Sequence, residues 1–144
     1  MVDEDLLKKI KAAQDAGASA ASVDELKLMY EFVKQISTEN EDLKEELEDM
    51  DIAISQILTD VDKKYWLTVK EGDLQYGEGD VDNPSFTMSS TLEVGAGILM
   101  GEVDATSAYM AGDITVEGNL QDAMAFQEII ELALEAYEDL AEDL

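Results

Sequence analysis

Gly112-Asp113-Ile114-Thr115-Val116-Glu117-Gly118-Asn119 is the stretch that decides the fold of this chain, with Ala123 and Met124 following closely. Its isoleucine and valine alternate with polar residues, which predicts a short strand over Asp113 to Glu117, between the two glycines. Beyond the asparagine, residues 120–140 contain no Gly or Pro and carry two adjacent apolar stripes. Such breadth predicts a long, deeply buried helix, so the motif joins a strand directly to a helix.

The residues just before this motif predict further helical structure. Residues 91–103 are largely apolar, contain only two acids and lack strand alternation, which favours a buried helix. Ser89 and Ser90 are its candidate N-caps, and glycines at 95, 97 and 101 loosen or end it. A short helical piece from Ala105 to Met110 then leads to the strand.

Four more strands are predicted upstream, at residues 52–59, 65–70, 74–77 and 85–89. Each shows period-2 alternation or is followed by a turn signal, such as Gly72 for a tight reversal. The strands follow one another in quick succession. We therefore expect an antiparallel meander.

The N-terminal part is predicted to be helical. Apolar residues spaced three or four apart between Leu6 and Ala13 indicate a short amphipathic helix that stops at Gly17. Residues 16–21 resemble a flexible connection, and Ser22 with Glu25 fits a capping box that starts a second helix. We expect residues 1–21 to form a helical extension and residues 22–144 the main domain.

Residues 26–50 allow two interpretations. Their apolar spacing of three and four, with Asn40 at an inward position, is typical of a parallel two-stranded coiled coil and indicates a homodimer. Thr38 and Glu41 form a second candidate capping box, and Ser37 to Asn40 are poor helix-interior residues. We favour two helices broken near residues 37–40.

The ordered set of elements over residues 37–140 resembles the sterol carrier protein 2 (SCP2) family of sterol-binding and lipid-transfer domains. The resemblance rests on Trp66-Leu67-Thr68-Val69 followed by Gly72, on the strand at Asp82 to Ser89, on Gly101 before a short helix, and on the strand from Gly112 to Gly118. It implies an α+β fold with a curved, mostly antiparallel five-stranded sheet covered by helices around an apolar tunnel. It also implies non-catalytic binding and transfer of a fatty acid, sterol or isoprenoid lipid.

If that fold is correct, the cavity should be lined by the inward side of the last strands and the two apolar helices. The methionines among these residues suit an adaptable site, because their thioether side chains are flexible. The predicted lipid-binding residues are Phe86, Met88, Leu92, Ile98, Leu99, Tyr109, Met110, Met124, Phe126 and Ile130.

The amino-acid composition limits the metal sites and catalytic groups that the chain can form. The chain has no Cys and no His, which removes the usual zinc and copper ligands, thiol nucleophiles and imidazole bases. We predict no catalytic residues, no metal and no cofactor. The chain lacks a long apolar run, and its N-terminus is acidic where a secretory signal is basic, so a cytoplasmic protein without stable membrane insertion is expected.

Charge limits the partners. The net charge is −26, and from Glu71 onward there are 18 acidic residues and no basic one. Nucleic-acid binding is therefore excluded, and an acyl-CoA would find cations for its phosphates only in the N-terminal half. A free fatty acid, an isoprenoid or an uncharged lipid fits better. The alternative function is an acidic dimeric scaffold or accessory subunit, in which residues 26–50 dimerise and the acidic surface binds a basic protein.

Overall fold

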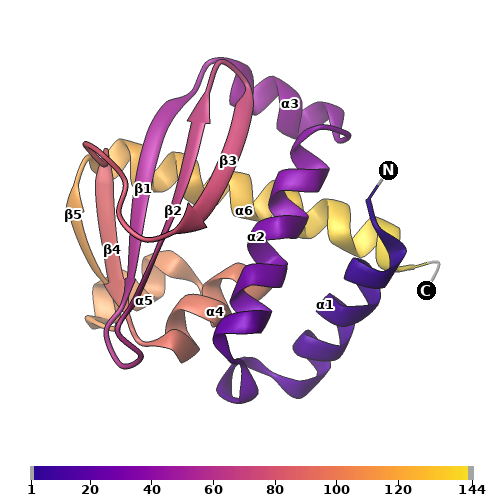
Figure 1. The fold of residues 1–144 in the computed structure, drawn as a ribbon, viewed down its shortest axis with the longest axis horizontal. Helices are drawn as coiled ribbons and strands as arrows, with labels where there is room; N and C mark the ends of the chain where they lie inside the picture. Colours follow the sequence, from indigo (N-terminus) through magenta and orange to yellow (C-terminus); the bar gives the residue numbers. More distant parts are fainter. Residues whose placement is uncertain (1, 143–144) are drawn as a thin grey trace.

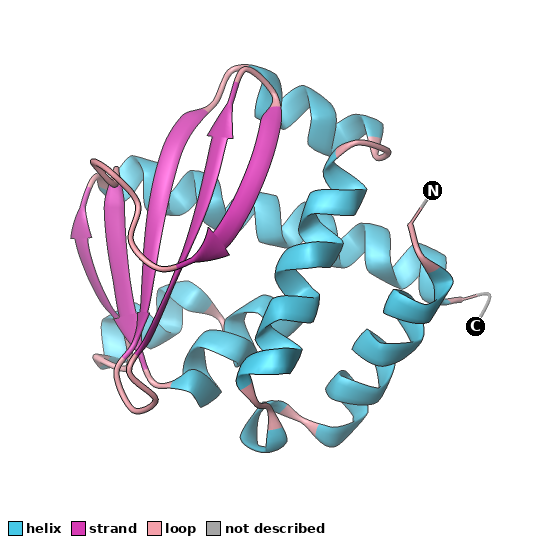
Figure 2. Ribbon diagram, in the orientation of Figure 1, coloured by secondary structure: helices cyan, strands magenta, loops and turns pink. Residues whose placement is uncertain are grey.

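The computed structural model describes residues 2–142, which form an α+β fold with helices packed against a five-stranded sheet (Figures 1 and 2). The strands are β1 Asp51–Leu58, β2 Lys63–Lys70, β3 Asp73–Glu78, β4 Phe86–Ser90 and β5 Thr115–Gly118. The helices are α1 Glu4–Ala16, α2 Val23–Ser37, α3 Glu41–Glu48, α4 Leu92–Met100, α5 Ala105–Ala111 and α6 Leu120–Ala141. The order of elements agrees with the sequence prediction.

The sheet is mixed, with strand order β3-β2-β1-β4-β5. Strands β1, β2 and β3 form the predicted antiparallel meander, and β4 pairs antiparallel with β5. The predicted antiparallel arrangement is wrong for β4, which lies beside β1 and runs parallel to it. The reason is the loop at residues 79–85, which returns across the meander in Figure 2 and ends where the Ser85 N–H donates to the Ala53 carbonyl at 2.6 Å.

The N-terminal helix α1 belongs to the same hydrophobic core as the rest of the chain. Its buried face carries Leu6, Leu7, Ile10 and Ala13, and it ends at Gly17 as predicted. The expected flexible connection contains a short 3₁₀ helix, η1 Ala18–Ala20. The Ala18 N–H donates to Glu102 Oε2 at 2.8 Å, which ties this segment to the loop after α4.

Residues 26–50 form two helices, so the continuous coiled coil is wrong. The predicted capping box of Ser22 and Glu25 starts α2, which ends at Ser37. Asn40, rather than Thr38, caps α3, because its side-chain oxygen accepts from the Leu43 N–H at 3.0 Å. Most of the proposed coil seam is buried in the chain's own core and is not free to dimerise: Leu26, Met29, Val33, Ile36, Leu43 and Leu47.

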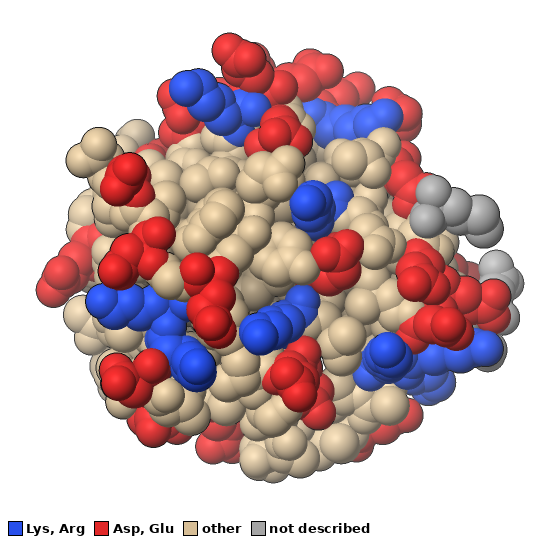
Figure 3. Space-filling model, in the orientation of Figure 1, with Lys and Arg blue, Asp and Glu red and all other residues tan. Residues whose placement is uncertain are grey.

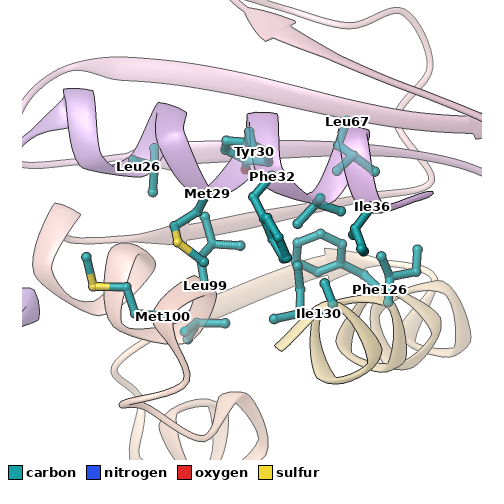
Figure 4. Close-up of a cluster of buried hydrophobic side chains, with 14 of the residues drawn as sticks. Leu26, Met29, Tyr30, Phe32, Ile36, Leu67, Leu99, Met100, Phe126 and Ile130 are labelled. Atoms are coloured by element: carbon teal, nitrogen blue, oxygen red, sulfur yellow. The ribbon is translucent and has the colours of Figure 1, made fainter. Parts of the chain in front are cut away.

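The core lies between the sheet and the helices. Figure 4 shows side chains of α2, α4 and α6 converging beneath the sheet, with Phe32 of α2 close to Phe126 and Ile130 of α6. The Phe32 ring meets Tyr137 of α6 edge-on, with centroids 5.8 Å apart. On the sheet, Trp66 covers Gly77, where an added Cβ would lie 2.6 Å from the indole ring.

A buried polar pair joins α2 to the central strand. The Tyr30 hydroxyl of α2 donates to Gln56 Oε1 of β1, and the Tyr30 ring stacks on Tyr65 and Tyr76. Burial raises the pKa of Tyr30 far above its usual range. Within the described residues, Gln56 Nε2 has no hydrogen-bond partner.

Helix α4 is capped by Thr91, whose hydroxyl accepts from the Val94 N–H at 3.3 Å, so the predicted caps Ser89 and Ser90 are wrong. Its glycines permit close packing: a Cβ on Gly97 would lie 2.6 Å from Val103 Cγ2. Gly101, with φ 83°, ends the helix as predicted. Apart from Glu93 in its first turn the helix is apolar, and its residues from Gly95 to Met100 are buried.

The second glycine of the deciding stretch has a specific steric role. Gly118 has φ 111°, and a Cβ there would lie 2.5 Å from the Ser85 carbonyl oxygen and 2.9 Å from the Phe86 Cα. Backbone atoms cannot move aside as a side-chain tip can. Only glycine therefore allows β5 to approach β4 this closely before the chain turns into α6.

We predict that Gly118→Ala lowers the free energy of unfolding by about 2–4 kcal/mol, because the positive φ and the backbone contact add. The matched control is Gly112→Ala, which has φ 85° but open space around the Cβ position. The control should cost only about 1–2 kcal/mol. Urea unfolding measures both, and equal losses in the two variants would disprove the close-approach explanation.

Candidate functional site

A cavity of about 730 Å³ lies among β4, β5, α5, residues 120–134 of α6 and the segment that follows α4. These elements come together at one end of the molecule, away from α1 (Figure 1). Its apolar lining includes Phe86 and Met88 of β4, Ile114 and Val116 beside and within β5, and Phe126 and Ile130 of α6. A volume of this size is usual for a small-molecule site.

Simple periodicities place these side chains. Phe86 and Met88 are two residues apart on β4 and face the same side of the sheet. Residues Ala123, Phe126, Ile130 and Leu134 recur at three and four positions along α6 and form one stripe over the cavity. The Phe86 and Phe126 rings, 6.1 Å apart, connect the strand to the helix.

The cap of α6 fixes the start of that helix beside the cavity. The Asn119 side chain accepts hydrogen bonds from the N–H groups of Gln121 and Asp122, at 2.9 and 3.3 Å. The Asn119 N–H in turn donates to the Ser85 carbonyl at 2.9 Å. The first turn of α6 is therefore anchored to Ser85, the residue that precedes β4.

Seven of the ten predicted residues line the cavity: Phe86, Met88, Ile98, Tyr109, Met124, Phe126 and Ile130. The other three do not. Leu99 is buried in the core beside Met29 (Figure 4), and Leu92 is partly buried at the start of α4. Met110 is 81% exposed and is absent from the cavity wall.

The prediction missed further lining residues: Val103, Ala105, Ile114, Val116, Leu120, Ala123 and Leu134. Some of these residues could have been predicted from the sequence pattern. Ile114 and Val116 are the alternating residues of the last strand, and Ala123 and Leu134 extend the helical stripe of Phe126 and Ile130 in both directions.

Partly exposed apolar side chains mark the mouth of the cavity. Met124 is 67% exposed, Leu120 52% and Tyr109 46%, yet all three line the cavity wall. Tyr109, predicted to bind the lipid, therefore lies at the mouth. A ligand would meet these residues before the buried floor.

The charged side chains on the cavity wall are all carboxylates, and none of the described lysines lines it. The four acids are Glu102, Asp104, Glu128 and Glu131. Asp104 caps α5 and accepts from the Ser107 hydroxyl at 2.7 Å and the Ser107 N–H at 3.0 Å, which lowers the pKa of Asp104. At the rim, Gln127 Nε2 donates to Glu131 Oε1 at 3.2 Å. Figure 3 shows a different situation on another face, where lysines lie among the acids.

Within residues 2–142, no group of acidic side chains is arranged to hold a metal ion. The cavity wall contributes apolar contacts and a few polar groups at its rim. Among the described helices, none combines the length and the hydrophobicity that crossing a membrane requires.

Glu46 of α3 lies against the outer side of the cavity wall. A hydrogen bond with the Glu128 carboxyl raises the pKa of Glu46, and desolvation and the Glu128 charge add to this. A carboxyl with a raised folded-state pKa holds its proton more tightly when folded. Its contribution to stability is therefore greatest at low pH and is lost as pH rises through the folded-state pKa.

We predict that Glu46→Gln raises the melting temperature at pH 7 by about 1–3 °C, since it removes repulsion from Glu128 and keeps a hydrogen-bond donor. Because its pKa is raised, the wild-type Glu46 takes up its proton more readily than an ordinary carboxyl as the pH falls, so the gain should shrink toward pH 4. Glu45→Gln, an exposed change on the same helix, is the control. Calorimetry at both pH values checks this, and an equal gain at pH 4 and pH 7 would contradict it.

An α+β fold with helices packed on its sheet and an apolar cavity between them is an architecture found among lipid-binding and lipid-transfer domains. The sequence agrees: residues 33–131, more than two thirds of the chain, match the model of the SCP-2 sterol transfer family. The chain belongs to this family. Comparison with curated protein sequences finds no match.

Solved structures show the same fold. Sterol carrier protein 2 from Yarrowia lipolytica, in its apo form, superposes with a TM-score of 0.60 at 15% identity and covers 74% of this chain and 90% of its own. Palmitated SCP2L2 from Aedes aegypti gives 0.55 at 17% identity, over 71% of this chain and 90% of that one.

The fold also occurs inside a larger enzyme. The stereoselective inverting sec-alkylsulfatase Pisa1 from Pseudomonas sp. matches with a TM-score of 0.54 at 18% identity over 62% of this chain. The match spans only 14% of that enzyme's length. At these identities the comparisons establish the fold alone.

Proposed function

We propose that this protein binds a hydrophobic lipid of the fatty acid, sterol or isoprenoid type in the cavity between β4, β5, α5 and α6, and carries it without chemical change. The observation that carries this proposal is the cavity itself: about 730 Å³ with Phe86, Met88, Phe126 and Ile130 on its wall. Membership of the family and the palmitated relative support the same interpretation.

Burial of the ligand's apolar chain contributes enough free energy to hold the ligand in the cavity. Burial of each methylene contributes about 0.8 kcal/mol, so ten methylenes give about 8 kcal/mol before the loss of translational and conformational freedom. Affinity in the micromolar range then needs no charged anchor. The Tyr109 hydroxyl at the mouth is placed to meet a polar head group.

The proposed role is that of a carrier rather than an enzyme. Among the described residues, the cavity wall carries no cysteine, histidine or lysine, so a thiol or amine nucleophile and an imidazole base that could activate Thr106 are not available there. The alternative, a dimeric scaffold, would need an exposed seam over residues 26–50, and most of that seam is buried inside the fold.

We predict that the purified protein takes up a fluorescent fatty acid with micromolar affinity. Ala123→Phe should weaken uptake at least about tenfold, since the new ring occupies the cavity. The control is Ala12→Phe, which adds the same side chain on the exposed surface of α1, outside the cavity.

Fluorescence titration measures the affinities, and organic extraction followed by lipid mass spectrometry identifies any lipid that co-purifies. Failure of the folded wild-type protein to take up the probe, with an empty extract, would disprove the carrier function. Equal binding by the two variants would show that the ligand occupies another place.

A further inference from the structure

We propose that the carboxylates around this cavity make it select amphiphiles with a cationic head group over anionic ones of equal chain length. The inference rests on the proposed function and adds the chemical class of the head group. It concerns the charge at the mouth of the cavity, whereas lipid binding as such depends on the apolar wall.

The charged side chains that line the cavity come from two separate segments but have one sign. Glu102 and Asp104 lie in the connection between α4 and α5, and Glu128 and Glu131 lie on consecutive turns of α6. A head group at the mouth therefore meets negative charge from two sides. The Ser107 hydrogen bonds keep Asp104 ionised, because they lower its pKa.

Lysines do not neutralise these acids. All nine lysines lie between residues 8 and 70, and those that form ion pairs in the described structure bind other acids: Glu4, Asp15, Glu41, Glu78 and Asp80. Glu128 has a further carboxyl group beside it, that of Glu46. The local field at the mouth is therefore negative.

The positive end of α6 does not offer an anion site either. The free N–H groups of a helix N-terminus attract anions, but here Asn119 already accepts from the N–H groups of Gln121 and Asp122. Asp122 adds a negative charge to the same turn. A ligand carboxylate would thus find repulsion and no ready donor pair at this position.

The expected difference in affinity between cationic and anionic amphiphiles is large enough to measure. Unit charges several ångströms apart near a protein surface interact strongly, and salt screens this interaction over about 10 Å at 0.1 M. The apolar tail makes the same contacts whatever the head group is. Differences in affinity between ligands of equal chain length therefore reflect the charge at the mouth of the cavity.

The test uses three probes that share a twelve-carbon chain: dodecylammonium, dodecan-1-ol and dodecanoate, each below its micelle concentration at pH 7. Each displaces the uncharged fluorophore N-phenyl-1-naphthylamine from the full-length protein. At low salt we expect dodecylammonium to bind at least about tenfold more tightly than dodecanoate, with the alcohol between them. In 0.5 M NaCl the ratio should fall about threefold or more.

Two double variants separate the mouth from the overall charge of the protein. Glu128→Gln with Glu131→Gln removes two charges from the cavity wall and should reduce the amine-to-carboxylate ratio about threefold or more. Glu135→Gln with Glu138→Gln removes two exposed charges farther along the same helix, outside the cavity, and should leave the ratio nearly unchanged.

Equal affinities for the three probes, or tightest binding of dodecanoate, would overturn the selectivity while leaving the carrier function intact. An equal reduction by both double variants would also overturn it, since the effect would then come from net charge. If none of the probes displaces the fluorophore and the fluorophore itself does not bind, the carrier function fails first, and the selectivity fails with it.

Discussion

Helix α6 has to bury two apolar stripes against two different surfaces, and the rest of the structure depends on this. One stripe, with Ile129, Ala133, Ala136 and Tyr137, is buried in the core beside Phe32 of α2. The neighbouring stripe, with Phe126 and Ile130, faces β4 and β5 across the cavity. The helix is therefore held by its first stripe, so the second can border open space without loss of position.

The junction between β5 and α6 determines where this helix starts. Gly118 lets β5 approach the backbone of Ser85 and Phe86, and Asn119 then caps the helix while bonding to the Ser85 carbonyl. Two adjacent residues, Gly118 and Asn119, thus determine the strand pairing and the helix cap. This geometry places the stripe of Phe126 directly opposite Phe86, with the cavity beside them.

Local patterns in the sequence were sufficient for the order of the elements and for most of the cavity wall. Alternation located β5, and the two stripes of α6 identified Phe126 and Ile130. The parallel partner of β4 could not be predicted, because the path of the loop at residues 79–85, not the pattern within the strand, decides the pairing. Helix α4 is apolar all round, so periodicity could not show that Ile98 faces the cavity while Leu99 faces α2.

The family-matched region begins at residue 33, within α2, yet the fold does not. Helix α1 and the first part of α2 supply Ile10, Leu26, Met29 and Phe32, all of them almost fully buried. A fragment cut at the family boundary would leave the inner surfaces of α4 and α6 open to water. The hydrophobic core of this protein therefore extends beyond the family-matched segment, and the described residues before position 33 supply part of the packing for α4 and α6.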